Sequence, residues 1–140
     1  MIGEEPSYRI SFIYRKILVP VDGSESSLKA LEIAIDLAKH YGSKITVVFV
    51  KSRHDKDDSE PLSKAKSRIA KEPVNVSYKL IEYDHETESV SYRLVKEIIE
   101  EGYDLVIMGA RGKTLYGELP IGSIALSVVI NAPISVLIVR

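Results

Sequence analysis

The sequence predicts an α/β fold of three layers, in which five parallel strands are covered on both faces by helices. Apolar, strand-like runs alternate with amphipathic helical segments along the chain after Arg15, which is the order of successive βα units. The runs are apolar at consecutive positions, as in LVIM at residues 105–108, and this is typical of strands buried on both faces. Right-handed crossovers then limit how the chain winds.

Length and composition exclude several classes of protein. With 140 residues we expect one domain over residues 16–140, preceded by an N-terminal extension over residues 1–15. A formal net charge of −1 gives no reason to expect nucleic acid or an anionic membrane as a partner. The chain has no cysteine, no long apolar run and no signal-peptide pattern, so we expect a cytoplasmic protein without disulfides or a membrane span.

The first half of the chain predicts two inner strands and two helices. These elements fall at residues 16–21, 24–41, 44–50 and 62–71. Pro20 stands at the end of the first strand, where its missing N–H harms no ladder, and Gly42 ends the first helix. Asp22 opens the turn between them. Its carboxylate either caps the helix or faces a ligand at the end of the strand.

The charged stretch between the second strand and second helix is interpreted as a solvated loop. His54, Asp55, Asp57 and Asp58 have no spacing that fixes them to one face, so a metal cluster is not expected there. A half-exposed edge strand at residues 74–81 and a helix at residues 88–101 follow. Gly102 is expected to end this helix, which should turn Val90, Leu94, Val95, Ile98 and Ile99 inward. His85-Glu86 between them begins like a zinc-protease motif, but the second histidine is missing.

A glycine-rich stretch after the apolar run at residues 105–108, the fourth predicted strand, is the strongest functional signal. Its glycines are Gly109, Gly112, Gly117 and Gly122, and Ser123 opens the apolar helical run that follows. Glycine lets backbone N–H groups approach an anion, and a helix start adds unpaired donors and a partial positive charge. The stretch predicts a phosphate-binding loop or, alternatively, a simple turn. A Walker A motif is excluded because Ile107 stands where that motif needs glycine.

The spacing of this stretch resembles a known nucleotide-binding signature. The pattern is similar to that of universal stress protein domains of the ATP-binding branch: two residues separate Gly109 from Gly112, and nine residues separate Gly112 from Gly122-Ser123. The resemblance extends to KILVPVDGSESSLKALEIA at residues 16–34 and APISVLIVR at residues 132–140. It implies a fold like that of the adenine nucleotide α-hydrolases, with strand order 3-2-1-4-5. In that order strands 1 and 4 are neighbours at the switch point, where ligands bind.

The resemblance also implies a set of contacts for ATP, ADP or AMP. On the adenine and ribose side these are Pro20, Val21, Asp22, Val50, Met108 and Gly109. On the phosphate side they are Arg111, Gly112, Gly122, Ser123, Ile124 and Ala125. Asp22 is also a candidate Mg²⁺ ligand. Val50 is alternatively an ordinary core valine. Arg111 stands where the family often has histidine, and an arginine keeps a permanent charge near the phosphates.

These observations favour a nucleotide-dependent switch or signalling module in the stress response. No general base stands out near the phosphates, so hydrolysis should be slow if it occurs. The alternatives are a slow ATPase and a homodimeric scaffold whose nucleotide is only structural.

The family resemblance implies a homodimer through the last strand, which begins at Ile134 and ends at Val139. Leu126 and Ile130 form an i, i+4 apolar pair, expected either to contact the extension, a partner or a client, or to be buried within the monomer.

Overall fold

The described part of the chain is an α/β domain built on one parallel sheet. The computed structural model describes residues 13–56, 59–111 and 121–140. Within these residues the strand order is β3-β2-β1-β4-β5 with all neighbours parallel, which confirms the predicted fold and order. The strands are β1 (Lys16–Pro20), β2 (Lys44–Ser52), β3 (Asn75–Tyr83), β4 (Leu105–Gly109) and β5 (Ser135–Val139). The helices are α1 (Glu25–Tyr41), α2 (Glu60–Arg68), α3 (Val90–Glu101) and α4 (Ser123–Asn131).

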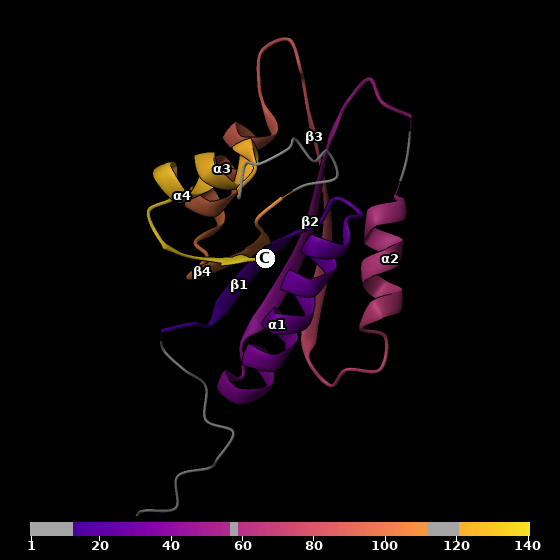
Figure 1. Ribbon diagram of the computed structural model, residues 1–140, viewed down its shortest axis with the longest axis vertical. Helices are drawn as coiled ribbons and strands as arrows, with labels where there is room; N and C mark the ends of the chain where they lie inside the picture. The colour runs from indigo at the N-terminus through magenta and orange to yellow at the C-terminus, as the bar shows by residue number, and fades with distance from the viewer. Residues whose placement is uncertain (1–12, 57–58, 112–120) are drawn as a thin grey trace, which may run out of the picture.

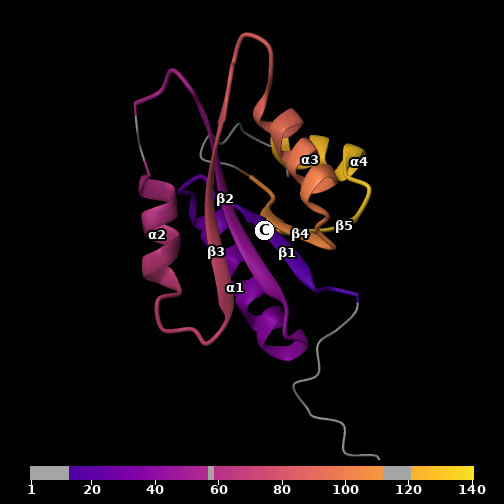
Figure 2. The same ribbon diagram turned by 180° about the vertical axis from the view of Figure 1, so that it is seen from behind.

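The helices cover the sheet as two separate layers. Helices α1 and α2 lie on one face, and α3 and α4 lie on the other (Figures 1 and 2). Successive side chains of a strand point to opposite faces, so Ile17 and Val19 pack under α1 while Leu18 packs under α3 and α4. All three are fully buried. Burial on both faces explains why the inner strands are apolar at consecutive positions.

The start of α1 excludes one of the two interpretations of Asp22, that of the helix cap. The N-cap is Ser24, whose Oγ accepts the N–H of Ser27 at 3.2 Å. Asp22 lies two residues earlier, where its Oδ1 accepts the Ser24 N–H at 3.0 Å. Asp22 is therefore not the cap but supports the residue that is. The other end of α1 stops at Gly42, as predicted, in the left-handed conformation with φ +70°.

Strands β2 and β3 are each two residues longer at their carboxyl ends than predicted. Their ladder runs to the Ser52 and Tyr83 pair, and the Arg53 N–H donates to the Tyr83 carbonyl at 2.8 Å. Charges at Lys51 and Glu82 suggested that the strands had already ended. Instead the Lys51 side chain is buried, and its Nζ lies 3.4 Å from Glu82 Oε2. Pairing across the ladder thus allows charged residues to extend both strands.

Helix α3 buries most of the face that its apolar periodicity predicts, since Leu94 and Ile98 are buried, but it differs at two positions. Ile99 was expected to point inward but is 61% exposed, whereas Glu97 is buried. The Glu97 carboxylate accepts from Lys79 Nζ at 2.8 Å and from the Tyr103 hydroxyl at 2.9 Å, which satisfies its buried charge. Burial, and then the negative charge of Glu97, raise the pKa of Tyr103 to about 12.

The amino-terminal end of the described chain is tied to the sheet. Arg15 N–H donates to Asp104 Oδ2 at 3.1 Å, and the Arg15 carbonyl accepts the Lys44 N–H at 2.8 Å. These bonds fix the entry into β1 beside the start of β4. Residues 1–12, most of the predicted extension, lie outside the described residues. No helix in the described part of the chain has the length and apolar character needed to cross a membrane.

Candidate functional site

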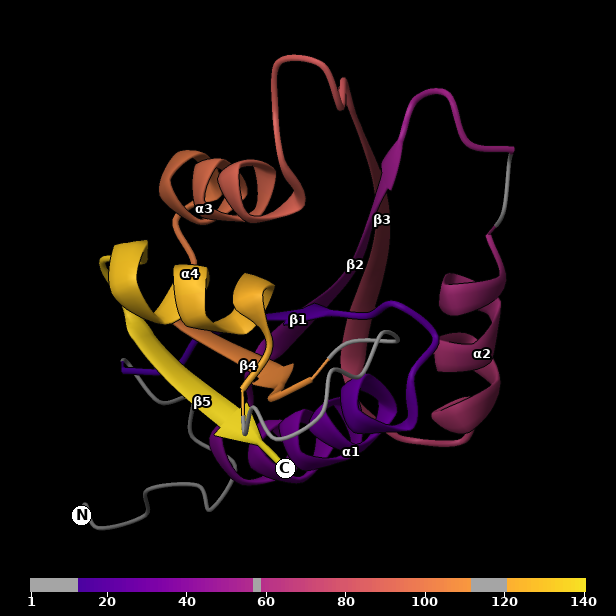
Figure 3. The same ribbon diagram turned by 45° about the horizontal axis from the view of Figure 1, so that its top comes forward.

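A cavity of about 500 Å³ opens at the carboxyl ends of β1 and β4. These two strands lie side by side at the centre of the sheet, with α1 and α4 on opposite sides of them (Figure 3). The predicted site residues that border the cavity are Pro20, Val21, Asp22, Val50, Met108, Gly109, Arg111, Gly122, Ser123, Ile124 and Ala125. Gly112 lies outside the described residues. The structure thus brings the other predicted contacts, from four separate segments, around one space.

One side of the cavity is apolar. Val21 directly follows β1, Val48 and Val50 come from β2, Met108 comes from β4, and Leu94 comes from α3. Each of these side chains is buried, with at most 9% of its surface exposed. Their alkyl groups form a water-excluding wall, which is the surface on which an uncharged, flat ring is stabilised.

Gly109 closes the end of β4 against the start of α1. A Cβ atom at this position would lie 2.9 Å from the backbone carbonyl carbon of Ser26, which is closer than real Cβ contacts allow. Ser26 Oγ in turn lies 3.4 Å from the carbonyl of Val139 on β5. Only glycine allows β4 and α1 to approach this closely, and Gly109 itself borders the cavity.

The turn after β1 presents a fixed carboxylate to the cavity. Gly23 adopts φ +87°, a conformation that side chains disfavour, and this brings Asp22 back over Ser24. Asp22 Oδ1 accepts both the N–H of Ser24 at 3.0 Å and its hydroxyl at 2.5 Å. Ser27 Oγ lies 3.4 Å from the Asp22 amide nitrogen and also borders the cavity. Asp22 is therefore held in place before any ligand arrives.

The start of α4 brings the first turn of a helix to the cavity. The N-cap is Gly122, which has no side chain to cap the helix, while Ser123, Ile124 and Ala125 border the cavity. The amide groups of a first turn have no partners within their own helix and carry part of the positive end of the helix dipole. The Gly122 N–H itself donates to the Ala110 carbonyl at 2.5 Å, so α4 begins directly beside the end of β4.

Six cavity residues were not predicted from the sequence. They are Ser27, Val48, Val90, Leu94, Ala110 and Ile121. Val48 could have been predicted from the sequence, because it lies two residues before Val50 on the same face of one strand. Val90 and Leu94 were not, because they belong to α3 and reach the cavity only through packing of that helix on the sheet.

Comparison with known proteins identifies the family. The model of the family described as "Universal stress protein family" matches residues 13–140, which is nearly the whole chain. The chain belongs to the universal stress protein family. A putative universal stress protein of Staphylococcus aureus is 32% identical over 142 residues, covering 91% of this chain and 84% of the relative.

Solved universal stress protein structures share the fold. One from Archaeoglobus fulgidus has a TM-score of 0.76 and 26% identity, covering 91% of this chain and 100% of that chain. A second, from the same organism in complex with dAMP, has a TM-score of 0.72 and 24% identity over 92% and 100% of the two chains. A third, in complex with cAMP, has a TM-score of 0.71 and 21% identity over 91% and 98%.

Proposed function

We propose that this universal stress protein binds an adenine nucleotide, ATP in particular, in the cavity at the ends of β1 and β4. The observation that supports the proposal is the division of one cavity of about 500 Å³ into an apolar side and a side lined by Asp22, Arg111 and the first turn of α4. A nucleotide has the same division: an apolar planar base, a ribose and a charged phosphate chain. The dAMP and cAMP complexes of two proteins with this fold support the same ligand class.

Each part of the nucleotide has a matching set of residues in the proposal. The adenine lies against Val50 and Met108, and Asp22 accepts a hydrogen bond from a ribose hydroxyl. The phosphates meet the first turn of α4 and the guanidinium of Arg111, whose charge is permanent. Mg²⁺ is usually held by phosphate oxygens and one or two carboxylates, and Asp22 is the carboxylate among the described cavity residues.

The cavity chemistry favours a switch over an efficient ATPase. The described lining residues include no histidine, and their one carboxylate, Asp22, already accepts two hydrogen bonds through Oδ1 from Ser24. A general base must lie within reach of the attacking water and be free to accept a proton from it. We therefore infer slow hydrolysis at most, so that signalling in the stress response follows from which nucleotide is bound and not from rapid turnover.

Calorimetric titration of the nucleotide-stripped protein with Mg-ATP, Mg-ADP and AMP tests the proposal. We expect a dissociation constant near micromolar for ATP, about −8 kcal/mol. Gly122→Val is the control variant: valine fits the backbone of this N-cap, φ −75° and ψ 161°, but its branched side chain blocks the approach of phosphate. Loss of ATP binding in this variant, with unfolding unchanged, supports the phosphate site.

A second variant separates charge from shape in the same experiment. Arg111→Ala removes the guanidinium beside β4 and should weaken ATP binding about tenfold, with a smaller effect on AMP, because ATP carries more phosphate charge. Equal affinities for wild type and Arg111→Ala would reject this role for Arg111. If neither ATP, ADP nor AMP binds the wild type, the nucleotide proposal fails and the scaffold function becomes the better explanation.

We also propose that the protein forms a homodimer through β5. This strand lies at one edge of the sheet, with β4 as its neighbour in the described residues, and Leu137 on it is 39% exposed. Leu126 and Ile130 of α4 are 45% and 69% exposed, so packing within the described monomer does not cover them. An unpaired strand edge beside exposed apolar side chains is stabilised by pairing with a second copy.

A further inference from the structure

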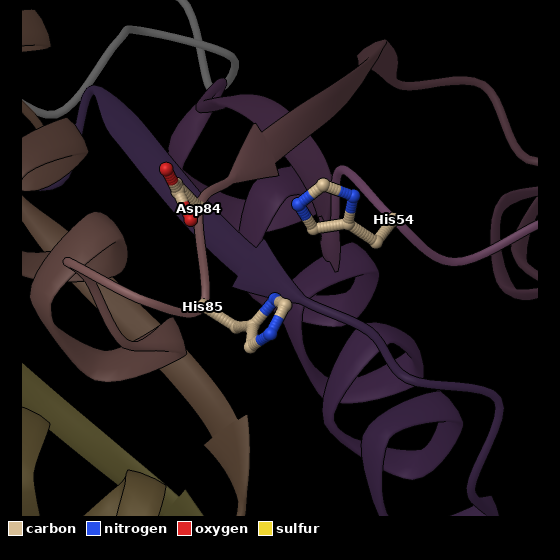
Figure 4. Close-up of side chains that lie close together, drawn as sticks. All are labelled: His54, Asp84 and His85. Atoms are coloured by element: carbon tan, nitrogen blue, oxygen red, sulfur yellow. The ribbon is translucent and has the colours of Figure 1, made fainter.

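Two histidines and an aspartate come together beyond the carboxyl ends of β2 and β3. Each of His54, Asp84 and His85 offers a ligand atom, and the three atoms lie within 4.8 Å of one another. The histidine rings are 5.2 Å apart at an angle of 83° (Figure 4). His54 comes from the segment after β2, and Asp84 and His85 come from the segment after β3, so 30 residues of sequence separate the two parts.

The extended ladder between β2 and β3 creates this arrangement. The Arg53 N–H donates to the Tyr83 carbonyl at 2.8 Å, which places the next residue of each segment, His54 and Asp84, at the same end of the ladder. Ser52 Oγ links both sides: it lies 3.3 Å from the His54 amide nitrogen and 3.4 Å from His85 Nδ1. The backbone therefore brings the three side chains together without a ligand.

Short turns hold the two segments in this position. On the β2 side, the buried Lys51 Nζ donates to the Ser52 and Asp55 carbonyls, at 3.2 and 3.1 Å, on either side of His54. On the β3 side, Asp84 Oδ1 accepts the Glu86 N–H at 3.0 Å. The hydrogen bonds described for Asp84 use Oδ1 and the backbone, which leaves Oδ2 to serve as a ligand.

We propose that His54, Asp84 and His85 form a zinc site. Two imidazole nitrogens and one carboxylate oxygen are a donor set that suits Zn²⁺ and not the all-oxygen preference of Mg²⁺ or Ca²⁺. Ligands on one tetrahedral zinc ion are roughly 3.3 Å apart, so small rotations of the exposed histidine side chains bring the 4.8 Å cluster to bonding geometry. Water completes the coordination, as it does in sites with three protein ligands.

This site is separate from the nucleotide cavity but connected to it. None of its three residues lines the cavity. The turn that carries Asp84 and His85 leads into α3, whose first residue, Val90, does line it. Bound zinc would join the ends of β2 and β3 and restrain the start of α3. The zinc site rests on geometry alone and does not depend on nucleotide binding.

Titration of the nucleotide-free, chelator-treated protein with Zn²⁺ alone tests the proposal. We expect one ion per chain at micromolar affinity or tighter. His54→Gln and His85→Gln should each weaken binding about tenfold or more. The matched control is His40→Gln, because His40, near the end of α1, is the one remaining histidine of the chain and lies outside the cluster. Its affinity should equal that of the wild type.

Thermal unfolding gives an independent measurement of the same site. Zinc that binds the folded state should raise the melting temperature of the wild type and of His40→Gln, but not that of His54→Gln. In excess chelator all variants should melt alike, because His54 and His85 are exposed. Stoichiometric binding that survives in both His54→Gln and His85→Gln would overturn the proposal, as would the absence of wild-type binding below about millimolar Zn²⁺.

Discussion

Gly109 packs against the start of α1 and borders the cavity, so we expect its substitution to affect both stability and the proposed nucleotide binding. In Gly109→Ala the new methyl group would contact the backbone of Ser26 at 2.9 Å, so α1 and β4 must separate. We expect a loss of about 1–3 kcal/mol in the free energy of unfolding, measured by urea denaturation, together with weaker nucleotide binding.

Gly102 provides the comparison for this variant. Gly102 has φ +69°, but a Cβ there meets nothing within 4 Å. Gly102→Ala should therefore cost about 1 kcal/mol from backbone strain and leave nucleotide affinity unchanged. If Gly109→Ala behaves in the same way as Gly102→Ala, the close contact with Ser26 has no importance for the cavity.

Tyr103 makes the stability of the folded domain depend on pH in the alkaline range. Its pKa is raised to about 12 in the folded state, against 10.0 for an unperturbed tyrosine. The unfolded chain therefore loses this proton first as pH rises, and ionisation favours unfolding. The contribution of the hydroxyl to stability is complete below pH 10 and is lost between about pH 10 and 12.

The variant Tyr103→Phe isolates this effect. At pH 7 it should lower the free energy of unfolding by about 1 kcal/mol, because Glu97 loses a hydrogen-bond donor. Guanidinium unfolding of both proteins at several pH values should show the difference between them shrinking from pH 10 to 12. A difference that stays constant over this range would contradict the assignment.

At the scale of elements, two serine caps allow a matched experiment on α1 and α3. Ser24 Oγ accepts the Ser27 N–H at 3.2 Å, and Ser89 Oγ accepts the Tyr92 N–H at 3.1 Å. Ser24→Ala and Ser89→Ala should each cost about 1 kcal/mol of stability. Ser24→Ala also removes a hydroxyl donor to Asp22 and should weaken nucleotide binding in calorimetry, whereas Ser89→Ala should not. Equal effects of the two variants on binding would contradict the proposed role of the Ser24 hydroxyl in positioning Asp22.

The order and type of elements could be predicted because they depend on local signals. Apolar runs defined β1 and β4, and Gly42 and Gly102 ended their helices as expected. The ends of β2 and β3 could not be predicted, since the buried Lys51 depends on contacts with Glu82 on the neighbouring strand and with the carbonyls of the following turn. The strand order itself was implied by family resemblance and not by periodicity.

What could not be predicted about α3 and His54 has the same origin in long-range contacts. The periodicity of α3 placed Ile99 inward, but Glu97 is buried instead, because Lys79 and Tyr103 come from other segments to satisfy it. His54 lies in an exposed turn, as predicted, but its ring contact with His85, 31 residues along the chain, was not predicted. Such groupings become visible only when the sheet brings distant segments together.

At the scale of the whole molecule, the exposed face of α4 and β5 predicts the oligomeric state. Leu126→Glu should convert the proposed dimer to a monomer while retaining stability, since this side chain is 45% exposed in the monomer. Sedimentation equilibrium measures the mass. Leu80→Glu on β3, at the opposite edge of the sheet and 40% exposed, is the matched control and should remain dimeric. A monomeric wild type, or dissociation in both variants, would contradict the β5 interface.

The central position of β1 also matters while the chain is being synthesised. β1 pairs with β2 on one side and with β4 on the other, and β4 begins 85 residues after β1 ends. A nascent chain that has emerged only as far as α3 therefore has an apolar central strand with one edge open, which is the kind of surface that favours aggregation. The cavity, whose lining residues are spread from Pro20 to Ala125, is complete only after the start of α4 has left the ribosome.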